Sequence, residues 1–197
     1  MDENASVPHS RSVVMINPDL STTPVYPLPD DCSVRWYTPG AERDWEAIHR
    51  DADHYGTVTP ELFRQQFGSS AAELSHRQCY LAHSRHGTIG TATAWYADDF
   101  LGGSYGRVHW VAIITAMQGR GLAKPLLSIV CRRLLELGHH RAYLTTATVR
   151  IAAINLYLRF GFRPYPRDRD EADAWQQLAP RLKFACPLPP PPEPQPE

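Results

Sequence analysis

The chain has 197 residues, 43% of them hydrophobic and 10% aromatic, which is enough for one well-formed core, and the length alone favours a single domain. Twenty Lys and Arg residues stand against 21 Asp and Glu residues, and the formal charge of −1 gives no bulk field that would favour nucleic acid or an anionic membrane. No stretch approaches the ~18 apolar residues of a membrane span. The cysteines lie far apart without a C-x-x-C pair, which indicates neither zinc nor disulfides and makes a reducing, cytoplasmic location the default.

Both ends are expected to lie outside the folded domain. Residues 1–30 mix Ser, Thr, Asn and Pro around one short apolar patch at 13–16, which predicts a flexible N-terminal segment. Residues 188–197 read "LPPPPEPQPE", which predicts a disordered proline-rich tail, with a ligand for a proline-recognition domain as the alternative.

Between the tails, strand-like and helix-like patterns alternate. Period-2 alternation and β-branched runs predict strands over residues 32–38, 78–84, 88–97, 107–114, 141–147 and 180–187. Apolar residues at helical spacing predict helices over residues 41–52, 59–67, 124–137 and 151–160. The order combines an antiparallel hairpin, turning at His86 and Gly87, with a crossover through the third helix. We therefore expect an α/β fold around a central mixed, mostly antiparallel sheet of six to seven strands with about four helices.

A glycine-rich stretch, "MQGRGLAKPL" at residues 117–126, lies between the fourth strand and the third helix. It is not a Walker A loop, because Lys124 follows Ala123 and the hydroxyl that would bind magnesium is absent. A dinucleotide fingerprint would place Lys124 where a helix and a strand must touch, and no ribose-binding acid follows. The pattern Q-x-x-G-x-A is met at Gln118, Gly121 and Ala123, and it predicts backbone amides that open a helix toward an anion such as a pyrophosphate.

Two correctly spaced motifs resemble the GNAT acetyltransferase superfamily. "VAIITAMQGRGLAKPLL" is similar to its acetyl-CoA loop, and "AAINLYLRFGF" is similar to its A-x-x-L-Y-x-x-x-G-F helix. The resemblance implies a GNAT domain over residues 33–187. Two residues depart from the family pattern. Thr115 stands where the family usually has a proline after the strand. Pro125 lies early in the helix, and proline is tolerated in the first turn of a helix.

The resemblance implies acetyl-CoA as cosubstrate and no metal. It places the pyrophosphate on the amides of residues 119–124 and the pantetheine arm on the main chain of Val111 and Ile113. Asn155 could bind the pantetheine amides, with a solvent-facing role as the alternative, and for the side chains of Arg120 and Lys124 simple solvation is the alternative to binding phosphate. The expected cofactor-binding residues are Val111, Ile113, Gln118, Gly119, Arg120, Gly121, Leu122, Ala123, Lys124 and Asn155.

The resemblance also implies that Tyr157, four residues before Gly161, is the acid that protonates the CoA thiolate. Without the family resemblance, a tyrosine on an apolar helix indicates a packing residue. His109 is the candidate general base, expected on the strand face of Val111 and Ile113 by alternation, with a hydrogen-bonded packing histidine as the alternative.

The expected reaction is transfer of an acetyl group from acetyl-CoA to a primary amine of a small molecule or a peptide terminus. The acceptor region is expected near residues 50–67, where Asp51, Asp53, His54 and Tyr55 cluster, and on the strand with Trp95 and Tyr96. A polar loop and a sheet core are the alternatives there. Two other functions stay open: a GNAT-like domain that binds acyl-CoA without turnover, and an interaction module that uses the proline tail. A homodimer also stays open.

Overall fold

The computed structural model describes residues 10–53 and 56–186, and these form seven strands and six α-helices. The α/β class and the number of strands expected from the sequence are confirmed. The described residues divide into two compact units, one of residues 19–142 and one of residues 10–18 with 143–186. Within the described part of the chain, no helix is both long and apolar enough to cross a bilayer.

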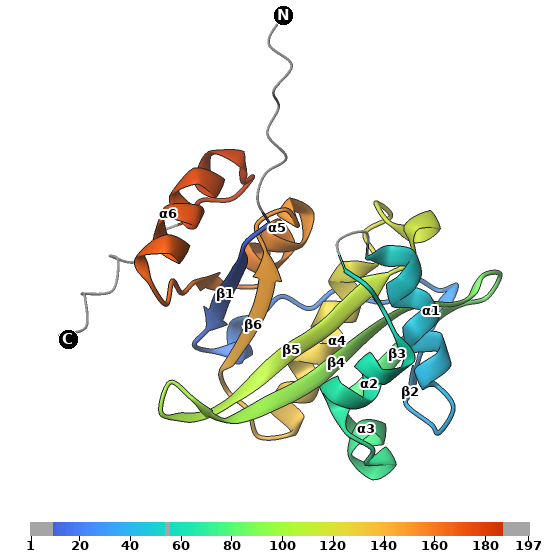
Figure 1. Ribbon diagram of the computed structural model, residues 1–197. Helices are drawn as coiled ribbons and strands as arrows, with labels where there is room; N and C mark the ends of the chain where they lie inside the picture. The colour runs from blue at the N-terminus through green and yellow to red at the C-terminus, as the bar shows by residue number, and fades with distance from the viewer. Residues whose placement is uncertain (1–9, 54–55, 187–197) are drawn as a thin grey trace, which may run out of the picture. The chain divides into compact units, whose positions relative to one another are not determined.

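The larger unit contains an antiparallel sheet in the order β2-β3-β4-β5 (Figure 1). Helices α1 to α3 cover one face of this sheet, and α4 covers the other. The elements are β2 (Cys32–Trp36), α1 (Glu42–Ala52), α2 (Pro60–Phe67), α3 (Ala71–Arg77), β3 (Gln78–His83), β4 (Gly87–Phe100), β5 (Gly103–Ile113) and α4 (Ala123–Glu136), with short 3₁₀ turns η1 (Leu20–Thr22) and η2 (Thr115–Met117).

The face under α1 to α3 is filled by rings. We call the buried residues that meet there the aromatic cluster: Tyr37, Ala41, Trp45, Ile48, Phe63, Phe67, Leu74 and Tyr80. Trp45 is completely buried, and its ring packs edge-on against Phe63 and Phe67 at centroid distances of 5.3 and 5.7 Å. Large apolar surfaces removed from water dominate core energetics, so this cluster holds α1 and α2 on the sheet.

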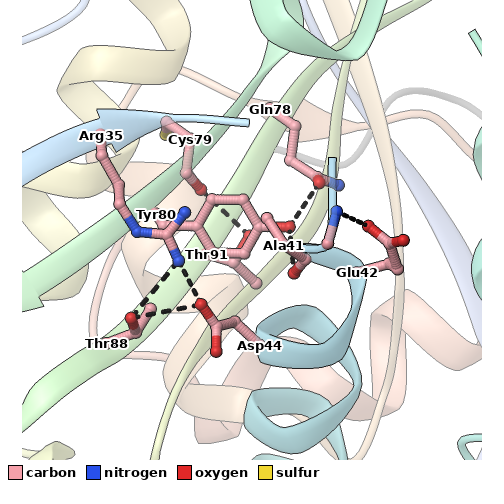
Figure 2. A network of polar contacts seen from close by, with 10 residues as sticks. Arg35, Ala41, Glu42, Asp44, Gln78, Cys79, Tyr80, Thr88 and Thr91 are labelled. Carbon is pink, nitrogen blue, oxygen red and sulfur yellow. Dashed lines mark hydrogen bonds and ion pairs between the residues drawn. The ribbon is translucent and has the colours of Figure 1, made fainter. Parts of the chain in front are cut away.

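Figure 2 shows the polar network that crosses the edge of this cluster. The Tyr80 hydroxyl lies 2.9 Å from the Ala41 carbonyl oxygen and 2.6 Å from Gln78 Oε1. The Arg35 guanidinium covers the Tyr80 ring at 4.4 Å and donates to the Asp44 carboxylate. Burial raises the pKa of Tyr80 far above its usual range, so the phenol stays protonated. The network therefore joins β2, β3 and α1 through neutral and paired groups.

The smaller unit contains β1 (Ser12–Asn17), all of β6 (Ala142–Ala147) but its first residue, α5 (Ile151–Arg159), β7 (Arg163–Pro164) and α6 (Arg169–Leu178), followed by the turn η3 (Ala179–Arg181). β1 and β7 pair antiparallel, with Met15 opposite Pro164. The Asn17 side chain donates to the Phe160 carbonyl oxygen at 2.8 Å, which fixes the end of β1 to the end of α5. Gly161 follows with φ of +83°, the left-handed conformation that ends α5.

Several predictions about the chain ends are wrong. Residues 1–30 are not a flexible segment throughout, because Val13, Val14 and Met15 are buried in β1. The strand predicted over 180–187 is absent from its described part, residues 180–186, where a 3₁₀ turn precedes irregular chain. Six α-helices form in place of about four, since α3 and α6 were missed. The proline-rich tail at 188–197 lies outside the described residues.

Candidate functional site

β5 carries a bulge near its C-terminal end. Thr93 of β4 pairs with His109 and Thr91 pairs with Ala112, so Ala92 alone opposes both Trp110 and Val111. Trp110 has φ of +49°, a left-handed conformation that is rare for a bulky residue. An extra residue in one strand shifts the alternation of side chains by one position. Odd-numbered residues before the bulge therefore point to one face of the sheet, and odd-numbered residues after it point to the other face.

The bulge corrects the expected position of His109. His109 pairs with Thr93 and contacts the Phe67 ring, so it lies on the face of α1 to α3. Ile113 pairs with Gly90, which opposes Leu81 beside buried Tyr80 and so lies on the opposite face. The prediction that His109 shares a face with Val111 and Ile113 is wrong, because strict alternation assumes a strand without a bulge.

His109 is buried in apolar surroundings, with 6% of its surface exposed. Its ring centroid lies 5.4 Å from that of Phe67 and 6.0 Å from that of Trp110. Within the described residues, Nε2 has no hydrogen-bond partner. Burial lowers the pKa of His109 well below its usual value, and the charges of Arg107 and His49 lower it further. The imidazole is therefore neutral near pH 7.

The chain then turns through a glycine loop, residues 118–122, into α4. Gly119 and Gly121 have φ of +75° and +80°, and open space surrounds the position where each Cβ would lie. The glycines are therefore required by the backbone conformation rather than by crowding. No side chain caps the start of α4, where Leu122 is the N-cap residue. The first amides of a helix lack intrahelical acceptors, so this loop and helix can bind an anion.

The side chains around the glycine loop have distinct positions. Gln118 turns back and donates from Nε2 to the Ile113 carbonyl oxygen at 2.9 Å, so it fixes the loop to the end of β5. The Lys124 ammonium lies 5.6 Å from the centre of the Tyr26 ring, and its backbone amide donates to Gly121. Arg120 is exposed. Arg120 within the loop and Lys124 just after it are therefore the cationic side chains nearest in sequence to the loop amides.

Asp51 fixes α1 to this region. Its carboxylate accepts a hydrogen bond from the Thr115 amide, and the Thr115 hydroxyl donates to the Asp51 carbonyl oxygen at 2.9 Å. Thr115 stands where the GNAT pattern usually has proline, which has no amide hydrogen to donate. The sequence placed Asp51 in the acceptor region, but its carboxylate is used to hold η2. His54 and Tyr55, the neighbouring candidates, lie outside the described residues.

The smaller unit holds the two remaining candidates on α5. The Asn155 side chain donates to the Ile151 carbonyl oxygen at 3.0 Å and accepts from the Lys183 amide at 2.7 Å, so both ends of its amide are engaged. Tyr157 is 9% exposed, and its ring packs against Phe162 at 6.1 Å. Asn155 thus has a structural role, fixing the chain after α6 to α5, that the sequence did not indicate.

Among residues 10–53 and 56–186, no group of three or more His, Cys, Asp or Glu side chains is placed to hold a metal ion.

The Acetyltransferase (GNAT) family profile matches residues 35–162, and the chain belongs to this family. The mycothiol acetyltransferase of Arthrobacter sp. (strain FB24) is 28% identical over 146 residues, which cover 72% of this chain and 45% of that protein. The chain thus spans less than half the length of this curated relative.

Solved structures share the fold. A GCN5-related N-acetyltransferase from Sphaerobacter thermophilus aligns with a TM-score of 0.63 and 22% identity, over 78% of this chain and 48% of that one. A GNAT family acetyltransferase from Colwellia psychrerythraea aligns with a TM-score of 0.61 and 12% identity, over 79% of this chain and 53% of that one. At these identities the likeness supports the fold alone.

Proposed function

We propose that the protein transfers an acetyl group from acetyl-CoA to a primary amine of a small molecule or a peptide terminus. Membership of the GNAT family supports acetyl-CoA as the cosubstrate. The observation that carries the proposal is the glycine loop, where two left-handed glycines lead into an uncapped helix. Such a backbone suits the pyrophosphate of a CoA thioester.

In this proposal, the amides of residues 119–123 bind the pyrophosphate, and the side chains of Arg120 and Lys124 add positive charge. The main chain of Val111 and Ile113 binds the pantetheine arm. The bulge supports this role, since Val111 has no one-to-one partner in β4. An amide there would also polarise the thioester carbonyl, as donors aimed at a developing oxyanion do. Gln118 acts indirectly, by fixing the loop to Ile113.

Replacing Gly121 by Val tests the pyrophosphate site. A β-branched residue resists φ of +80°, so the loop should change shape and acetyl-CoA affinity should fall by roughly tenfold or more in calorimetry. Gly87→Val is the matched control, because Gly87 also has positive φ, +69°, and open space but lies at the start of β4 in the β3–β4 hairpin. Equal affinities for the wild type and Gly121→Val would reject the site.

Catalysis then requires removal of one proton and delivery of another. The neutral amine attacks the thioester carbonyl, and His109 takes a proton from the amine nitrogen directly or through a water molecule. The carbon–sulfur bond breaks, and the Tyr157 hydroxyl protonates the departing thiolate. His109 is supported by its neutral, buried imidazole on the face of α1 and α2, the helices on either side of the expected acceptor loop.

The role of Tyr157 is tested by Tyr157→Phe, which keeps the ring and removes the proton. Turnover should fall by roughly 10² or more, while acetyl-CoA affinity changes little. Tyr165→Phe removes a hydroxyl from the same unit and should leave turnover near the wild-type value. If the two variants turn over at equal rates, Tyr157 is a packing residue.

The role of His109 is tested by the pH dependence of kcat/KM. A base acts when neutral, so the rate should rise with pH through the pKa of His109 and reach a plateau. Because burial lowers that pKa, the inflection should lie below the usual histidine value of about 6.5. His109→Gln should remove the inflection, whereas His139→Gln should keep it, although burial also lowers the pKa of His139. An inflection that survives His109→Gln would exclude His109 as the base.

The acceptor class is tested by release of CoA thiol with a panel of amines. Of the acidic residues in the expected acceptor region, Asp51 already accepts a hydrogen bond from the Thr115 amide, so its carboxylate is less available to pair with a long basic peptide. Small primary amines and short peptides with a free amino terminus should therefore react faster than a lysine-rich peptide. Faster reaction of the lysine-rich peptide would reject this acceptor class. Binding of acetyl-CoA without turnover of any amine would favour a non-catalytic acyl-CoA-binding domain.

A further inference from the structure

One row of polar side chains crosses the face occupied by the aromatic cluster. Gln78 on β3 pairs with Thr93 on β4, and Thr93 pairs with His109 on β5. Directly paired residues point to the same face of a sheet, so the three side chains form a line across three strands. Gln78 and Thr93 are completely buried, and His109 is 6% exposed.

The hydrogen bonds at one end of this row fix its direction. Tyr80 can donate its hydroxyl proton to Gln78 Oε1 at 2.6 Å (Figure 2), which leaves the amide nitrogen of Gln78 to donate elsewhere. Gln78 Nε2 then donates to Thr93 Oγ1 at 3.2 Å. A hydroxyl oxygen has two lone pairs, so Thr93 can accept one further hydrogen bond. The next polar group along the row is the His109 imidazole.

The His109 ring is incompletely satisfied at the other end of the row. Its Nε2 has no hydrogen-bond partner among the described residues, and no hydrogen bond joins it to Thr93. Cβ atoms of directly opposed residues lie ~4.5–5.5 Å apart, so Thr93 is the polar side chain of the row nearest to the imidazole. For Nδ1–H to donate to Thr93 Oγ1, the ring must turn from its position in the structure. The tautomer of a histidine is set by the hydrogen bond that its other nitrogen makes.

We propose that Thr93, oriented by Gln78, is a positioning residue that accepts a hydrogen bond from His109 Nδ1 and so keeps the lone pair on Nε2 for the acceptor amine. The inference rests on the proposed function, because it assigns a residue that positions the base which that function needs. No bond is broken by Thr93 itself. It accepts a hydrogen bond from the neutral imidazole, and the same bond persists in the imidazolium formed when Nε2 takes the proton.

The charged and titratable groups that face His109 are few. Arg107 lies two residues before it on β5, and His49 lies on α1; both lower the pKa of His109. From α2 the contact is Phe67, which carries no charge. Thr93 and Gln78 are neutral, so the row orients the ring without adding a negative charge that would raise this pKa.

The test replaces Thr93 by Val, which keeps the shape and removes the acceptor oxygen. In the protein saturated with acetyl-CoA, nitrogen-15 NMR of the His109 ring should show Nδ1 protonated in the wild type. Thr93→Val should increase the population with the proton on Nε2 and lower kcat by about tenfold, with KM for acetyl-CoA within about twofold of the wild type. Thr93→Ser keeps the hydroxyl and should restore both the tautomer and kcat.

Thr91→Val is the matched control. Thr91 is equally buried on the same strand and face, and its hydroxyl donates to the Cys79 carbonyl oxygen at 3.0 Å. It should lose stability as Thr93→Val does, yet keep the wild-type tautomer and kcat. The proposal is overturned if Thr93→Val leaves the tautomer unchanged, or if Thr91→Val alters it equally. Should no amine react with the wild type, the proposed function fails, while the NMR result still decides the role of Thr93.

Discussion

The left-handed backbone of Trp110 determines which side chains of β5 point to each face of the sheet. A bulky residue in this conformation costs of the order of 1–3 kcal/mol, and the surrounding contacts must offset that cost. The Trp110 ring packs edge-on against Trp45 at 5.0 Å, and its indole nitrogen donates to Gln66 at 3.0 Å. The aromatic cluster therefore stabilises the bulge, and the bulge in turn places His109 against the same cluster while Ile113 points to the other side.

The glycine loop is held in place by the elements around it. Gln118 binds the last residue of β5, and Thr115 binds the end of α1. Loops rich in glycine lose much conformational entropy when they become ordered. Because these contacts are made within the fold itself, part of that entropy is lost on folding rather than on binding, which favours affinity. The contact between Asp51 and Thr115 also joins this loop to the helix before the expected acceptor region.

The sequence predicted those elements whose signals are local. The helix over 124–137 is confirmed to within one residue at each end, because an apolar stripe precedes Gly138, which has φ of +86°. The hairpin of β3 and β4 and the helix over 151–160 follow from similarly local patterns. The family was also predicted correctly, since both of its motifs are contiguous.

What the sequence could not predict depends on contacts between distant residues. The bulge at Trp110 has no glycine to mark it, so alternation placed His109 on the wrong face. The strand at 12–17 was hidden by the polar residues and prolines around it, although its apolar run is buried in the fold. The engagement of Asp51 by Thr115 and of Asn155 by Lys183 joins residues 64 and 28 positions apart, and no local pattern signals such pairs.

The segment between β1 and β2 shows that the boundaries of a family and of a fold need not coincide. Leu20 is completely buried, and its amide donates to the His140 carbonyl oxygen beyond the end of α4. Farther along, the Tyr26 amide donates to the Ser128 hydroxyl, which itself donates to the Pro24 carbonyl oxygen. The segment thus runs along α4 against its direction and brings an aromatic ring to Lys124. A protein trimmed to residues 35–162 would lack the segment that packs along α4. The side of α4 that this segment buries would then be exposed to water.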